Sequence, residues 1–251
     1  MTTSTVPASE PDHVAPRLTS PGRVLVTGGS SGLGAAVARA VAHAGGHALV
    51  LDRVTPPEPD RPGGRRDFVH ADLADTEAAQ RAVVELARRA GGLDSVVCAA
   101  GVDRCGALED VPTDEWERVV RVNLFGTAAV CRAAVPALRR ARGRIVTVAS
   151  TLGLRAVSDA TAYCASKFGV VGFTRALAAE LAGAVGVTLV VPGGMRTRFF
   201  DDREERYRPA DDSRLNPPEH VADAVLFALR QPAGCEIREL MVSHSEEGSW
   251  P

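Results

Sequence analysis

Short apolar runs alternate with longer segments of helical period, and this alternation constrains the fold of the 251-residue chain more than any other feature. The runs are apolar throughout, which predicts strands buried on both faces. Strands are predicted at 24–27, 48–52, 68–70, 95–98, 144–149, 187–191 and 239–243. Helices are predicted between them, at 32–44, 75–90, 113–140, 160–182 and 218–229. This order predicts an α/β fold, a doubly wound parallel sheet of about seven strands flanked by helices.

Three segments fall outside this pattern. Residues 1–21 are rich in Thr, Ser and Pro without a hydrophobic period, which predicts a disordered tail before one domain at 22–251. Residues 53–66 form a Pro-rich loop where a helix could have been. Residues 198–217 carry charges and aromatic rings before the last helix, which predicts a mobile substrate loop that belongs to the same domain.

Composition argues against several classes of partner. The 29 basic and 31 acidic residues give a net charge of −2, so no bulk charge favours nucleic acid or an anionic membrane. Neither a signal-peptide pattern nor an apolar stretch long enough to cross a bilayer is recognised, and a cytoplasmic location is expected. Five cysteines at irregular spacings fit free thiols better than disulfides or a metal site, and no metal is expected. The expected partner is a small molecule.

A glycine-rich turn, TGGSSGLG, joins the first predicted strand to the first predicted helix. Glycines there let the backbone approach a pyrophosphate, and the helix N-terminus offers N–H groups and the positive end of a dipole. Purely structural glycines are the alternative, but the flanking strand and helix are the context that a dinucleotide motif requires. The turn predicts a Rossmann-fold dinucleotide site with contacts from Gly28, Ser30, Ser31, Gly32, Leu33 and Gly34.

Asp52 ends the second predicted strand and bears on the choice of dinucleotide. A carboxylate there can accept hydrogen bonds from both adenosine-ribose hydroxyls and repels the extra phosphate of NADP, so NAD is favoured over NADP. Arg53 follows and could instead pair with that phosphate, or simply face the solvent. Asp72 and Leu73 follow the third strand, where the adenine is expected, although Asp72 could equally cap the next helix.

Residue types that are scarce in this chain gather near position 163. Tyr163 and Lys167 are four residues apart on one predicted helix, so they share a face, and Ser150 ends the preceding strand. Lys167 is the only lysine among the 29 basic residues. A tyrosine hydroxyl titrates near about 10, and a neighbouring ammonium lowers this pKa by stabilising phenolate. The spacing therefore predicts a tyrosine acid/base assisted by a lysine.

Taken together, the glycine turn, Asn123 in VNLFG, Ser150, the YCASK segment and PGGMRT resemble the short-chain dehydrogenase/reductase family over residues 23 to about 197. The resemblance implies an oxidoreductase that transfers a hydride between NAD(H) and a small alcohol or ketone. It implies additional cofactor contacts from Ala99, Gly101, Tyr163, Lys167, Pro192, Met195 and Thr197. The segment Cys98-Ala99-Ala100-Gly101 departs from the family's Asn-Asn-Ala-Gly, and this affects a strand-stabilising hydrogen bond.

The resemblance also implies a role for each member of a catalytic tetrad. Tyr163 would be the general acid/base, and Ser150 would orient the substrate oxygen. Lys167 would hold the nicotinamide ribose and lower the pKa of the tyrosine. Asn123 would hold a water on the proton path. The alternative function is a non-catalytic NAD(H)-binding sensor or scaffold on the same fold, while an epimerase or dehydratase usually needs a longer chain.

The substrate and the assembly are less defined by the sequence. A largely apolar pocket is expected from Leu152, Leu154, Phe199, Phe200 and Tyr207. Arg104 and Arg155 are candidates for an anionic handle, with solvated surface arginines as the alternative. The Ala-, Gly- and Arg-rich composition fits a tailoring step in bacterial secondary metabolism. The resemblance implies a homotetramer formed through the helices at 113–140 and 160–182, whose many small residues permit close packing between subunits, with a dimer as the alternative.

Overall fold

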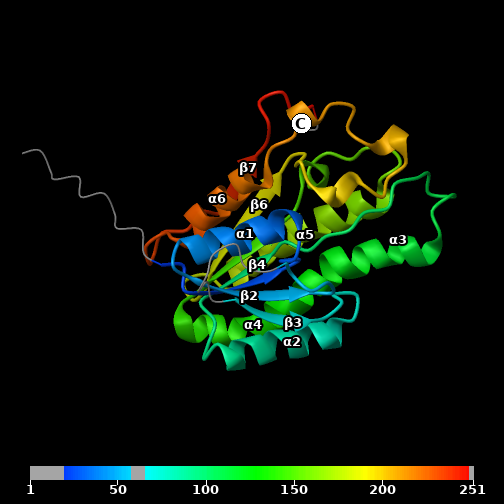
Figure 1. Cartoon of the computed structure of the whole chain (residues 1–251). Helices are drawn as coiled ribbons and strands as arrows, with labels where there is room; N and C mark the ends of the chain where they lie inside the picture. Colours follow the sequence, from blue (N-terminus) through cyan, green and yellow to red (C-terminus); the bar gives the residue numbers. More distant parts are fainter. Residues whose placement is uncertain (1–19, 58–65, 249–251) are drawn as a thin grey trace, which may run out of the picture.

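A computed structural model describes residues 20–57 and 66–248. The described residues contain one parallel sheet with the strand order β3-β2-β1-β4-β5-β6-β7, which confirms the predicted doubly wound fold (Figure 1). The strands are β1 (Arg23–Thr27), β2 (His47–Asp52), β3 (Arg66–His70), β4 (Ser95–Cys98), β5 (Arg144–Val148), β6 (Gly186–Pro192) and β7 (Glu239–Val242). The predicted tail at 1–21 lies outside the described residues, apart from Ser20 and Pro21.

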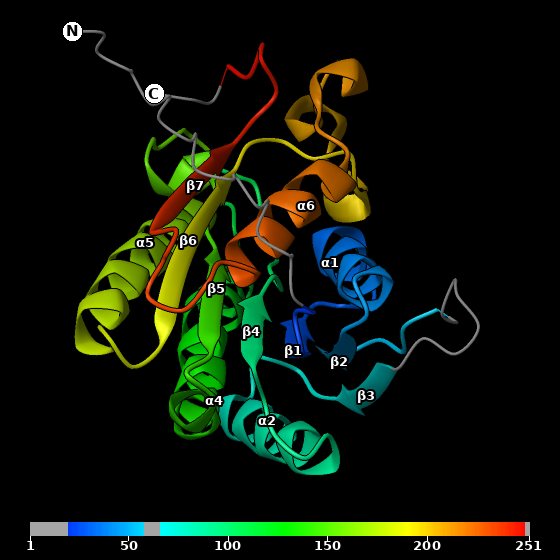
Figure 2. The same ribbon diagram turned by 90° about the vertical axis from the view of Figure 1, so that its left-hand side faces the viewer.

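Helices cover both faces of the sheet, which explains why its strands are apolar throughout (Figure 2). In β1, Val24 and Val26 pack with the helices on one face, whereas Leu25 packs with those on the other. The helices α1 (Gly32–His43) and α6 (Pro218–Leu229) cover the first face. The helices α2 (Thr76–Arg89), α4 (Thr127–Ala141) and α5 (Thr161–Glu180) cover the second.

The prediction of a single helix at 113–140 is wrong in one respect, because a π-helical turn interrupts the helix. The chain forms α3 (Thr113–Val120), then the π-helical turn at Arg121–Gly126, and then α4. The turn lies against the segment after β3: a Cβ added at Gly126 would lie 2.8 Å from Leu73 Cβ and 2.9 Å from the Leu73 carbonyl oxygen. π-Helical turns inside α-helices are frequent at functional sites, and this one contains Asn123.

This longest helical stretch also passes a test of length and composition for a membrane span. The stretch Thr113–Ala141 has 29 residues; its most apolar 18-residue window has a mean hydropathy of 1.2, and half of that window is buried inside the fold. Such a helix is also typical of the core of a soluble protein, so the stretch is weak support for a membrane span.

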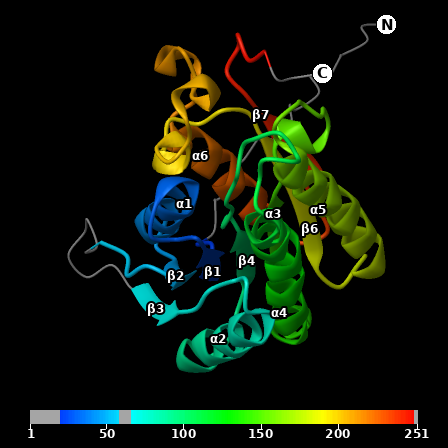
Figure 3. The ribbon, with the colours of Figure 1, turned by 90° about the vertical axis from the view of Figure 1, so that its right-hand side faces the viewer.

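The structure describes part of the first irregular segment and all of the second. Strand β3 begins at Arg66, inside the loop predicted at 53–66, of which 58–65 lie outside the described residues. The segment at 198–217 contains three short 3-10 turns, at Arg198–Phe200, Glu205–Tyr207 and Asp212–Arg214 (Figure 3). Its end is tied to the segment after β6, because Asn216 N donates to the Gly194 carbonyl at 3.0 Å.

Candidate active site

The carboxyl ends of all described strands meet at one edge of the sheet. Chain order reverses there between β1 and β4, which is the point at which open α/β sheets form a ligand crevice. Every sequence-predicted site lies at this edge or on the helices beside it. The residues that follow strand ends are Gly28 after β1, Arg53 after β2, Asp72 and Leu73 after β3, Ala99 and Gly101 after β4, Ser150 after β5, and Met195 and Thr197 after β6.

The glycine turn is shaped by close backbone contacts. Gly28 has a φ of +68°, and a Cβ there would lie 2.8 Å from the Cα of Ala100. A Cβ at Gly34 would collide with the carbonyl oxygen of Gly28. At Gly32, a Cβ would lie 3.5 Å from Thr197 Cγ2, so the segment after β6 lies against the turn. The turn thus requires glycine at Gly28 and Gly34 for its own close packing, and it leads into the N-terminus of α1, the kind of helix end that binds a pyrophosphate.

The Asp52 carboxylate is held against this turn. One oxygen accepts from Ser30 N at 3.0 Å, and the other accepts from Val54 N at 3.0 Å. A carboxylate has about four acceptor positions, so each oxygen can still accept a ribose hydroxyl. Arg53 is exposed beside it. The site therefore fits the adenosine ribose of a dinucleotide.

Asp72 does not cap the next helix, so that alternative is wrong. The cap of α2 is Asp75, whose side chain accepts from the N–H groups of residues 77 and 78. Asp72 accepts from Ala74 N and pairs with Arg118, each at 2.9 Å. Burial opposes its charge, but these contacts outweigh burial and lower the pKa of Asp72. Leu73 is buried in the core, so only its backbone is available to a ligand.

Tyr163 and Lys167 lie in the first turns of α5, and both are buried. The Lys167 ammonium donates to the Val148 carbonyl at 2.9 Å and lies 5.5 Å from the centroid of the Tyr163 ring. Ser150 follows β5, and its hydroxyl accepts from Leu152 N at 3.2 Å and hydrogen-bonds to Tyr163. The structure therefore brings Ser150, Tyr163 and Lys167 into one site.

The fourth member of the tetrad, Asn123, uses its side chain to hold the loop after β4. Its amide donates to the Val102 carbonyl at 2.9 Å and to Ser166 Oγ at 3.0 Å, and its oxygen accepts from Val102 N at 2.8 Å. Its backbone carbonyl accepts from Thr127 Oγ1 at 2.8 Å. Asn123 thus ties the π-helical turn, the strand-end loop and α5 together.

The protonation of the site differs from the expectation at Tyr163. Burial raises the pKa of Tyr163 above its ordinary value, the Asp103 carboxylate raises it further, and the hydrogen bond with Ser150 and the charge of Arg203 only partly oppose this. The expected lowering by Lys167 does not prevail over the effect of burial on Tyr163, and burial also lowers the pKa of Lys167 itself to about 8. In this structure, the Tyr163 phenol is therefore protonated at neutral pH.

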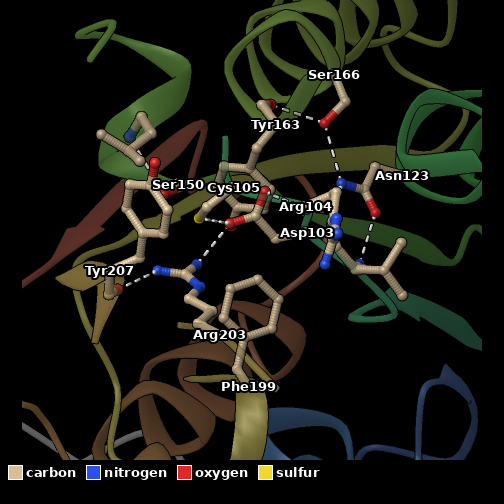
Figure 4. A network of polar contacts seen from close by, with 12 residues as sticks. Asp103, Arg104, Cys105, Asn123, Ser150, Tyr163, Ser166, Phe199, Arg203 and Tyr207 are labelled. Atoms are coloured by element: carbon tan, nitrogen blue, oxygen red, sulfur yellow. Dashed lines mark hydrogen bonds and ion pairs between the residues drawn. The ribbon is translucent and has the colours of Figure 1, made fainter. Parts of the chain in front are cut away.

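Two charged residues beside Tyr163 were missed by the sequence analysis. The Asp103 carboxylate, after β4, pairs at 2.7 Å with the Arg203 guanidinium of the 198–217 segment, the predicted substrate loop, and both side chains are largely buried (Figure 4). Phe199 of the same loop lies 5.8 Å from the Tyr163 ring, centroid to centroid. Neither charged residue belongs to a motif, and their 100-residue separation leaves no local signal.

The arginines proposed from the sequence as anionic handles have partners at the surface. Arg104 pairs with Glu115 at 2.5 Å, and Arg155 donates to the Gly248 carbonyl at 3.1 Å. At the departure from the family's asparagine pair, the thiols of Cys98 and Cys131 lie 3.8 Å apart in the core. Among residues 20–57 and 66–248, no group of three or more His, Cys, Asp or Glu could hold a metal ion.

Comparison with known proteins identifies relatives along most of the chain. A model of the short chain dehydrogenase family matches residues 22–208. Trans-4-hydroxycyclohexanecarboxylate dehydrogenase of Sinomonas cyclohexanicum is 31% identical over 216 residues, covering 81% of this chain and 83% of that protein. A glycine betaine reductase of Emericella nidulans is 33% identical over 89% of this chain, which spans 19% of that protein's length. A short chain dehydrogenase of Burkholderia cenocepacia in complex with NADP aligns with a TM-score of 0.77 and 30% identity, over 91% of this chain and 98% of that chain.

Proposed function

Since the chain belongs to the short-chain dehydrogenase family and is thus an NAD(P)-dependent oxidoreductase acting on CH–OH groups, we propose that Tyr163 is its general acid/base. The observation that carries the proposal is the burial of Tyr163 and Lys167 beside Ser150, at the edge of the sheet where the glycine turn and Asp52 lie. The bound nicotinamide supplies the hydride acceptor or donor.

In the proposed mechanism, each side chain acts on the substrate oxygen or on the phenol. During reduction, Tyr163 donates its proton to the carbonyl oxygen, and Ser150 donates a hydrogen bond to the same oxygen. The Lys167 ammonium stabilises the phenolate that forms. Asn123 holds the π-helical turn in place and, through its own polar groups, a water on the proton path. Because burial raises the pKa of Tyr163, the phenol is protonated near neutral pH, which is the form that donates to a carbonyl oxygen.

NAD is proposed as the cofactor in preference to NADP. The support is Asp52, because its carboxylate is fixed by Ser30 N and Val54 N where it would repel a ribose phosphate. The relative from Burkholderia cenocepacia was solved with NADP, and Arg53 is the residue of this chain that could bind the extra phosphate.

The substrate is proposed to be a small alcohol or ketone, and the pathway a tailoring step of bacterial secondary metabolism in the cytoplasm. Names of relatives do not narrow this choice, since they refer to a cyclohexanecarboxylate and to glycine betaine. We propose a homotetramer, with a dimer as the alternative, because the predicted helices at 113–140 and 160–182 carry many small residues, and Phe125 and Phe168 on these segments are exposed. Light scattering measures the oligomeric state directly.

The experiment measures the change in cofactor absorbance over a panel of ketones and secondary alcohols, with the NAD and NADP forms in parallel. Tyr163→Phe should abolish turnover and leave NADH binding nearly unchanged. The matched control is Tyr207→Phe, which removes the only other phenol of the chain, in the substrate loop. Full activity of the Tyr163 variant would refute the acid/base role. NADH binding without turnover by the unmodified protein would favour the sensor alternative.

A further inference from the structure

The Asp103–Arg203 pair joins two segments that enclose the catalytic tyrosine. Asp103 follows β4, and Arg203 lies in the substrate loop between two of its 3-10 turns. The carboxylate and the guanidinium are 2.7 Å apart, and the side chains are only 5% and 18% exposed. Such burial distinguishes the pair from Arg198–Asp201 in the same loop, whose side chains are 91% and 55% exposed.

Further contacts fix both members of the pair. The carboxylate of Asp103 accepts from Arg104 N at 2.7 Å and from the Cys105 thiol at 3.2 Å. The Arg203 guanidinium lies over the rings of Phe199 and Phe200, at 5.1 and 4.6 Å from their centroids. In the part of the chain that the structure describes, Arg203 Nε is buried without a hydrogen-bond partner. Arg203 is therefore a cation in an apolar setting whose main neutralising contact is Asp103.

Both charges act on the site where the substrate oxygen is expected. Asp103 raises the pKa of Tyr163, whereas Arg203 lowers it. The ring of Phe199, which Arg203 covers, is also a neighbour of the Tyr163 ring (Figure 4). The pair is thus part of the wall that a substrate bound at Tyr163 would meet.

We propose that the Asp103–Arg203 pair makes this site selective for uncharged alcohols and ketones, with Asp103 preventing Arg203 from binding a substrate carboxylate. The proposal rests on the proposed function in placing the substrate beside Tyr163. A carboxylate that paired with Arg203 would leave Asp103 buried, unpaired and beside a second negative charge, which is strongly unfavourable. An uncharged substrate leaves the pair in place.

Binding of benzoate and of its uncharged isostere benzamide tests this directly. Calorimetric titration is carried out on the unmodified protein and on Asp103→Asn, each saturated with the reduced cofactor. The asparagine keeps the shape of the side chain and releases the Arg203 charge. We expect the ratio of benzoate affinity to benzamide affinity to rise at least about tenfold in Asp103→Asn. In this variant, the Arg203 guanidinium can form a charge-assisted contact with the benzoate carboxylate in place of its contact with Asp103.

Two further variants make the result specific to the pair. Asp201→Asn disrupts the exposed pair of the same loop and should leave the affinity ratio unchanged. The double variant Asp103→Asn/Arg203→Gln should not show the rise in the ratio of benzoate to benzamide affinity, because it lacks the guanidinium that binds benzoate. Melting temperatures of all variants show whether each is folded.

Several results would overturn the proposal. One is a preference of the unmodified protein for benzoate over benzamide. Another is an Asp103→Asn variant that does not bind benzoate or whose ratio of benzoate to benzamide affinity is unchanged. A third is a rise in this ratio that persists in the double variant. The titration needs no turnover, so it is independent of the Tyr163→Phe assay. An active Tyr163→Phe enzyme with the expected shift in ratio would refute the proposed mechanism and leave the selectivity standing.

Discussion

Lys167 should titrate near pH 8 in the folded protein, because burial lowers its pKa from 10.5 to about 8. Between these two values the unfolded chain binds more protons than the folded chain, so this residue makes the protein more stable as the pH rises. The linkage relation gives a gain of roughly 2.5 kcal/mol in the free energy of unfolding between about pH 7 and about pH 10. Lys167→Met lacks the titrating group and should lack this gain.

The assay is favourable because Lys167 is the only lysine. Protein that carries lysine labelled with ¹³C at the ε-carbon alone gives one side-chain resonance, which reports the titration without assignment. Denaturant unfolding of the unmodified protein and of Lys167→Met, at each pH, gives the difference in stability, in which other titrating groups cancel. A midpoint near the ordinary lysine value, or a difference in stability that does not change with pH, would refute the argument from burial.

Two further substitutions test the cofactor site and the π-helical turn. Asp52→Ala should weaken NADH binding at least about tenfold, through loss of charge-assisted hydrogen bonds, and should weaken NADPH binding less; fluorescence titration that shows equal losses would contradict a ribose role. Gly126→Ala places a methyl group against Leu73, which should cost about 1–3 kcal/mol and lower Tm by several degrees. Gly172→Ala, where an added Cβ meets nothing within 4 Å, is the control and should not lower Tm.

The sequence predicts the order of strands and helices because each strand lies between two covered faces. That burial makes the strands apolar throughout, and the helical period of the segments between them stands out by contrast. The π-helical turn could not be predicted in the same way. It changes the phase of the helix at one place while the apolar pattern of 113–140 continues on both sides, and it packs against Leu73, which lies 53 residues before Gly126 in the chain.

The residues of the candidate site also fall into those that local spacing predicts and those that depend on the tertiary fold. Ser150, Tyr163 and Lys167 could be predicted because helix geometry and strand ends bring residues of known spacing together. Asp103 and Arg203 could not, because their contact depends on how the substrate loop folds back over α5. The pKa of Tyr163 was predicted in the wrong direction for a related reason: spacing shows which charge is near, but only the fold shows how deeply the phenol is buried.

Glycines outside the recognised motifs determine how closely the catalytic segments approach one another. A Cβ at Gly153 would lie 2.9 Å from the Lys167 carbonyl oxygen, so the turn that begins at Ser150 packs directly on the backbone of α5. A larger residue would push Ser150 away from Tyr163, although no catalytic side chain had changed. Gly126 has the same relation to Leu73 on the cofactor side. Positions such as these, which carry no chemistry of their own, fix the distances on which the proposed proton transfer depends.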